Sequence, residues 1–97
     1  MVKNLNWFNT TLLPKLSGYD IKFNTFKGGD FGDLERIEIE GNEKGVTIDF
    51  WSLGWISIHA YDYALDMEIM NVLTEPHEQI KIEDAFLRLE NILISSK

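Results

Sequence analysis

The sequence predicts an α+β fold, in which an antiparallel meander of four to five β-strands packs against helices from both ends of the chain. Two observations carry this prediction. Apolar and polar residues alternate through much of residues 36–61, as in strands with one buried face. Near both ends of the chain, apolar residues recur at three- and four-residue spacing, which is typical of amphipathic helices. At 97 residues the chain is expected to form one domain, residues 1–97.

The first expected element is a short helix over residues 5–16. Its apolar positions are Leu5, Phe8, Leu12 and Leu16. Pro14 weakens this prediction, because proline lacks an N–H and clashes with the preceding helical turn.

Alternation over residues 19–24 predicts the first strand. The glycines of residues 28–33 predict a flexible loop, because glycine reaches backbone angles that other residues avoid. Three further strands are expected at residues 36–40, 46–51 and 55–61.

The connections between these strands can be tested for consistency with the hydrophobic pattern. If Ile39 pairs with Val46, then Ile37 meets Ile48, and Arg36 meets Asp49 on the opposite face. A three-residue loop with Gly54 in the left-handed conformation sets the next register. That register pairs Trp51 with Trp55, Phe50 with Ile56, Ile48 with Ile58 and Val46 with Ala60. A two-residue loop would place Phe50 opposite Ser57 and move every side chain to the wrong face, so we predict the three-residue loop.

This register gives the sheet two different faces. The core face is expected to carry Ile37, Ile39, Val46, Ile48, Phe50, Ile56, Ile58 and Ala60. The other face is expected to carry Arg36, Glu38, Thr47, Asp49, Trp51, Trp55, Ser57, His59 and Tyr61.

The pattern of residues 68–73 fits both a further strand and a helical turn. Residues 74–76 (Thr-Glu-Pro) resemble a helix start, because threonine can cap a helix and proline is tolerated in its first turn. A helix should follow, with its apolar stripe covering the core face of the sheet. The stripe consists of Ile82, Ala85, Phe86, Leu89, Ile92 and Leu93.

The formal charge of −7 argues against nucleic acid as a partner, because proteins that bind phosphate backbones need basic faces. The charge is uneven: residues 1–27 hold four lysines and one aspartate, and residues 28–97 hold five basic and fifteen acidic side chains. No apolar run approaches the roughly 20 residues that span a bilayer, so no membrane partner is expected. The lack of cysteine fits a reducing compartment, and we expect a cytoplasmic protein.

No residue pattern indicates catalysis, a metal or another cofactor. Asp49, Ser57 and His59 share a face, but Asp49 is expected opposite Ser57, where it cannot orient the imidazole as a base. Two acidic groups with histidine lack the ligand spacing of zinc or calcium sites. These groups are His59, Asp62 and Asp66, and Glu75, His77 and Glu78. The glycine-rich loop lacks the Lys-Ser/Thr pair of a phosphate-binding loop.

Four aromatic residues of the central region favour a protein partner: Trp51, Trp55, Tyr61 and Tyr63. Tryptophan and tyrosine anchor interfaces because they bury a large area at low entropic cost. Their acidic neighbours suit a basic protein. Cover by the N-terminal helix or by a second copy of the chain explains the same residues equally well.

The central segment Gly45–Ile56 (GVTIDFWSLGWI), the following Tyr61-Asp62-Tyr63, and Glu68–Leu73 before a terminal helix resemble small bacterial toxin-immunity proteins. Those of contact-dependent growth inhibition systems are the nearest comparison. The resemblance covers residues 45–94. It implies a non-enzymatic inhibitor that binds a toxin domain, often a nuclease, and blocks its active site or substrate channel in a one-to-one complex.

Carried onto this sequence, the resemblance implies partner-binding roles for residues of three kinds. The tryptophans and tyrosine would be anchors, the carboxylates would pair with toxin lysines and arginines, and the histidine would form hydrogen bonds. The residues are Asp49, Trp51, Trp55, His59, Tyr61, Asp62 and Asp66. The alternative is a structural or regulatory domain that forms a homodimer through its aromatic sheet face.

Overall fold

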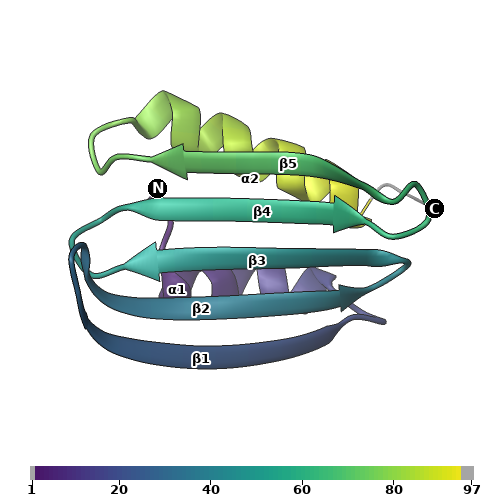
Figure 1. Cartoon of the computed structure of the whole chain (residues 1–97), viewed down its shortest axis with the longest axis horizontal. Helices are drawn as coiled ribbons and strands as arrows, with labels where there is room; N and C mark the ends of the chain where they lie inside the picture. Colours follow the sequence, from purple (N-terminus) through teal and green to yellow (C-terminus); the bar gives the residue numbers. More distant parts are fainter. Residues whose placement is uncertain (1, 95–97) are drawn as a thin grey trace.

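A computed structural model describes residues 2–94 of the chain and confirms the α+β class. A five-stranded antiparallel sheet has the strand order β1-β2-β3-β4-β5, and both helical segments lie on one side of it (Figure 1). The N-terminal helical segment comprises α1 (Leu5–Trp7), the π-helical η1 (Phe8–Leu12) and the 3₁₀-helical η2 (Leu13–Lys15). The strands are β1 (Asp20–Gly29), β2 (Gly32–Gly41), β3 (Lys44–Trp51), β4 (Ile56–Asp62) and β5 (Met67–Thr74), and α2 spans Gln79–Ile94.

The N-terminal helix lies where the sequence predicts it, but its geometry is irregular. The side chain of Asn4 begins it by accepting a hydrogen bond of 2.8 Å from the backbone N–H of Trp7. The helix widens into a π turn and then tightens into a 3₁₀ turn that contains Pro14. Because proline has no N–H to donate, an undistorted α-helix cannot continue through this position. Phe8 and Leu12 are nevertheless fully buried.

The first hairpin is longer than predicted. The expected strand over residues 19–24 extends to Gly29, and the loop expected over residues 28–33 contracts to a tight tip between Gly29 and Gly32, which face each other. Gly28 and Gly32 have positive φ angles of 76° and 95°. The glycines therefore permit the tight turn and the irregular pairing before it, rather than a mobile loop.

The central register is confirmed. Ile37 pairs with Ile48, and Arg36 with Asp49. Phe50 pairs with Ile56 across a loop in which Gly54 has φ 99°. All eight residues predicted for the core face are buried: Ile37, Ile39, Val46, Ile48, Phe50, Ile56, Ile58 and Ala60.

The structure places residues 68–73 in a strand, so the helical-turn alternative is wrong. The predicted helix start at residues 74–76 is also wrong, because α2 begins at Gln79. Thr74 ends β5 instead, and its buried hydroxyl donates to the carbonyl of Ile56. The chain then turns, with the side chain of Glu78 accepting from the backbone N–H of Glu75.

Aromatic contacts join the helical layer to the sheet. Phe86 of α2 lies edge-on to Trp7 at 4.8 Å between ring centroids and stacks near Phe50 of β3 at 6.1 Å. The hydroxyl of Tyr19 donates to the carbonyl of Leu93 at 2.6 Å, and Lys3 forms a salt bridge of 2.9 Å with Glu83. These contacts tie residues near the N-terminal helical segment to α2 on the same side of the sheet.

Phe86→Ala should lower the free energy of unfolding by about 3–5 kcal/mol, because it leaves a cavity between both helical segments and β3. Leu87→Ala is the matched control, since Leu87 is 64% exposed. It should change stability by about 0.5 kcal/mol or less. Urea unfolding measures both variants, and equal losses would contradict this description of the core.

Candidate functional site

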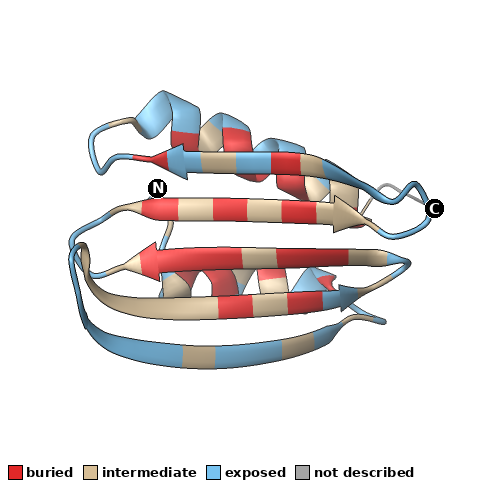
Figure 2. Cartoon of the chain, in the orientation of Figure 1, coloured by how far each residue is buried: buried red, intermediate tan, exposed pale blue. Residues whose placement is uncertain are grey.

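The helices leave one face of the sheet uncovered, here called the outer face (Figure 1). Buried and half-buried residues alternate over residues 56–61 of β4 (Figure 2). Because successive strand residues point to opposite faces, the half-buried Ser57, His59 and Tyr61 belong to the outer face. Every residue predicted for this face is half-buried except Asp49, which is buried. The prediction that the sheet has one core face and one different, more accessible face is confirmed.

One end of the outer face is apolar. Phe31, from the tip of the first hairpin, stacks on Trp55 with ring centroids 4.3 Å apart and an angle of 8°. The same ring lies edge-on to Trp51 at 5.5 Å. Phe26 and Leu34 pair beside Trp51 on β1 and β2. We call these five residues the indole end.

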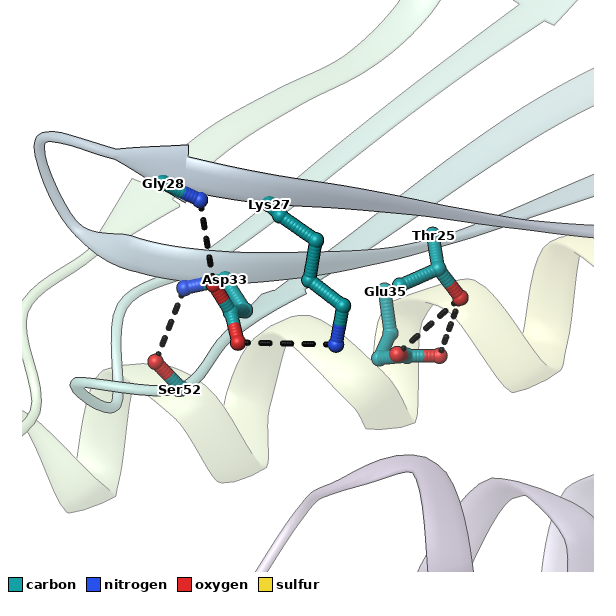
Figure 3. Close-up of polar contacts among 6 residues, drawn as sticks. All are labelled: Thr25, Lys27, Gly28, Asp33, Glu35 and Ser52. Atoms are coloured by element: carbon teal, nitrogen blue, oxygen red, sulfur yellow. Dashed lines mark hydrogen bonds and ion pairs between the residues drawn. The ribbon is translucent and has the colours of Figure 1, made fainter.

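Backbone hydrogen bonds fix Phe31 over the tryptophans. The carbonyls of Asp33 and Phe31 accept from the backbone N–H groups of Ser52 (2.8 Å) and Leu53 (3.2 Å). The Ser52 hydroxyl in turn accepts from the N–H of Asp33 at 2.9 Å (Figure 3). A side chain at Gly32 would collide with Ser52, so this contact requires glycine. Phe31 was not among the residues predicted for a site, and its only signal in the sequence was an aromatic residue beside the glycine of a tight turn.

In the middle of the outer face, an ion pair within the chain neutralises the charge of Asp49. Arg36 donates two hydrogen bonds to Asp49, from Nε to Oδ1 at 2.8 Å and from Nη2 to Oδ2 at 3.1 Å. The hydrogen bond to Asp49 raises the pKa of Arg36, and its guanidinium lies 5.4 Å from the ring centroid of Phe26. Because the Asp49 side chain is only 8% exposed, its carboxylate serves this internal ion pair.

The opposite end of the face combines tyrosines with carboxylates. Tyr63 donates from its hydroxyl to Glu40 (2.9 Å to Oε2), and Tyr61 donates to Asp66. The two rings lie 5.6 Å apart. These hydrogen bonds raise the pKa of both phenols. A neutral phenol orients a carboxylate without cancelling its charge, so this tyrosine end (Glu40, Tyr61, Tyr63, Asp66 and Glu68) is negative at neutral pH.

His59 and Asp62, two of the predicted partner-binding residues, lie on opposite sides of the sheet. His59 lies on the outer face, with Nε2 2.7 Å from Oε2 of Glu68. Asp62 follows Tyr61 in β4, so strand alternation directs it to the other side of the sheet. Its Oδ1 accepts from the N–H of Leu65 at 3.0 Å and shapes the turn into β5.

The seven candidate residues therefore do not form one cluster. Trp51 and Trp55 lie at the indole end, whereas Tyr61 and Asp66 lie at the tyrosine end, about 20 Å away at 3.3–3.4 Å per strand residue. His59 lies between the two ends, on the same strand as Tyr61. Asp49 is buried in its ion pair, and Asp62 belongs to a turn.

Among the described residues, Asp49, Ser57 and His59 are not joined as a catalytic triad. Asp49 pairs opposite Ser57 as predicted, and His59 bonds to Glu68 rather than to either of them. Within residues 2–94, no three His, Cys, Asp or Glu side chains are grouped so that they could hold a metal ion. None of the helices in this range is long and apolar enough to cross a bilayer.

Removing the Arg36 side-chain charge should leave Asp49 buried and unpaired. Arg36→Gln should therefore lower the free energy of unfolding by about 1–3 kcal/mol, a range reduced for the partial exposure of the guanidinium. The double variant Arg36→Gln/Asp49→Asn should recover most of this loss, because no charge remains uncompensated. Urea unfolding of both variants tests this, and a double variant less stable than the single would contradict it.

Asp66→Asn should return the pKa of Tyr61 toward that of free tyrosine, about 10. The raised phenol pKa contributes stability that is present below pH about 10 and is lost as the pH rises through the folded-state pKa. The variant should therefore lose less stability than wild type over that alkaline range. Ring-carbon NMR titration follows Tyr61 and Tyr63 separately. Glu40→Gln is the reciprocal control and should shift Tyr63.

Comparisons with known proteins give no indication of the function of this chain. No protein-family model, no curated protein and no solved structure matches the chain. A proposal about its function therefore rests on the arrangement of its own residues.

Proposed function

We propose that this protein is an immunity protein, which binds a bacterial toxin domain, a nuclease, and covers its active site or substrate-binding surface. The observation that carries the proposal is the uncovered outer face with its oriented carboxylates. Both helical segments pack on the other side of the sheet, so the outer face is accessible to a large partner (Figure 1). The proposed complex is one-to-one, and the protein itself performs no reaction.

Charge supports a cationic partner. A nuclease presents basic surface to its phosphate substrate, and an acidic inhibitor can occupy that surface. At the tyrosine end, Glu40 and Asp66 accept hydrogen bonds from neutral phenols and keep their charge for a partner. With a formal charge of −7, the whole molecule also attracts a basic protein over a distance.

The two ends of the outer face suggest two kinds of contact. The tyrosine end would pair with toxin lysines or arginines. At the indole end, Trp51 and Trp55 already pack against Phe31 within the chain, so binding would require little further ordering of these side chains. An interface that reaches both ends has a span suited to a stable protein complex, which buries roughly 800 Å² on each partner.

The proposal is tested with the toxin domain encoded beside this protein's gene. Glu40→Gln/Asp66→Asn removes two charges from the tyrosine end and preserves side-chain shape. We expect it to slow association about 3- to 10-fold at low ionic strength and to flatten the dependence of the rate on salt. Stopped-flow binding measures the rate, and a nuclease assay measures protection.

The matched control is Asp84→Asn/Glu75→Gln, which removes the same charge from exposed positions outside the sheet face. It should change the association rate less than twofold. Equal effects of the two double variants would exclude the outer face as the binding surface. If the neighbouring gene encodes no toxin and no basic partner is bound, the immunity proposal fails.

The homodimer alternative makes a different prediction. If the indole end joined two copies of the chain, Trp55→Asp would convert a dimer to a monomer in sedimentation equilibrium. A monomeric wild-type protein excludes this alternative and leaves the one-to-one complex in place.

A further inference from the structure

A cavity of about 490 Å³ opens on the helix-facing side of the sheet, below the hairpin tips. The N-terminal segment from Val2 to Leu5 forms one wall, and Phe50 and Ile56 form an apolar floor. Lys27 and Glu35 lie at its polar side. Its volume falls within the range of about 300–1,000 Å³ that is usual for small-molecule sites.

Both lysines of the cavity have partners within the chain. Lys3 forms its salt bridge with Glu83, and its Nζ lies 4.8 Å from the ring centroid of Trp7. Lys27 lies 3.6 Å from Oδ2 of Asp33, whose other oxygen accepts from the N–H of Gly28 (Figure 3). Both oxygens of the Asp33 carboxylate therefore already have partners within the chain.

Glu35 is different. It pairs with Phe50 across the sheet and therefore points to the helix side, where Figure 3 shows it beside Thr25. The Thr25 hydroxyl lies 3.1 and 3.2 Å from the two carboxylate oxygens. A hydroxyl has one proton and no charge, so it cannot satisfy both oxygens. Among residues 2–94, no lysine, arginine or histidine nitrogen lies within 4.0 Å of this carboxylate.

We infer that this cavity binds a small primary amine with an apolar chain. The ammonium group would donate to the carboxylate of Glu35, a half-buried residue, and the chain would lie on Phe50 and Ile56. A charge-assisted hydrogen bond combined with burial of an apolar chain is the usual basis of such recognition. Trp51 of the indole end also borders the cavity. Glu35, Phe50 and Ile56 point to the helix side of the sheet, so this inference does not rest on the proposed function.

Three probes with the same chain isolate the contribution of the head group: hexylamine, hexanol and hexanoate. We expect hexylamine to bind at least about fivefold more tightly than hexanol, because one charge-assisted contact at a partly exposed site contributes about 1 kcal/mol. Hexanoate should bind most weakly, since Glu35 would repel it. Titrations followed by ¹H–¹⁵N NMR should shift the amides of Phe50 and Ile56.

Glu35→Gln should reduce the preference for hexylamine over hexanol to less than twofold. Glu38→Gln is the matched control, because it removes the same charge from the same strand but lies on the outer face. It should leave the preference unchanged. Equal binding of hexylamine and hexanol to the wild-type protein, or shifts confined to other amides, would overturn the inference without requiring any variant.

Discussion

The side-chain alternation of β2, β3 and β4 is the constraint on which the rest of this structure depends. Successive strand residues point to opposite faces, so the loop between β3 and β4 decides which set is buried. Gly54 takes a positive φ of 99°, and an added Cβ there would come within 2.9 Å of Pro76. The same register that buries Ile48 and Ile58 also brings Arg36 to Asp49 and places the half-buried indoles of Trp51 and Trp55 on the outer face.

The placement of both helical segments on one face is what gives the outer face its functional interest. Phe86 contacts Trp7 and Phe50, so α2, the N-terminal helix and the sheet share one core. Neither helical segment of residues 2–94 lies over the other face, although this face carries two tryptophans and several carboxylates. Large aromatic side chains left at a surface are more informative than scattered apolar ones, because they commonly mark a site of association.

The side-chain contacts divide the outer face into a neutral middle, a negative end and an aromatic end. The Arg36–Asp49 ion pair neutralises the middle of the face and serves the stability of the sheet. The phenols of Tyr61 and Tyr63 orient carboxylates without adding opposite charge, which leaves one end negative. Phe31 packs against both tryptophans at the other end. The number of carboxylates on this face therefore overstates the charge available to a partner, because a carboxylate such as Asp49 is already paired with a cation within the chain.

The sequence by itself determined the class of fold, the central register and the membership of both sheet faces, because period-two alternation is a local property of the strands. It located both helices, but not the π and 3₁₀ turns around Pro14 or the late start of α2. Only the tertiary structure decided that Phe31 covers Trp51 and Trp55, that Asp62 serves a turn, and that Glu40 joins Tyr63. These contacts join residues distant in the chain, and hydrophobic periodicity carries no information about which loops meet.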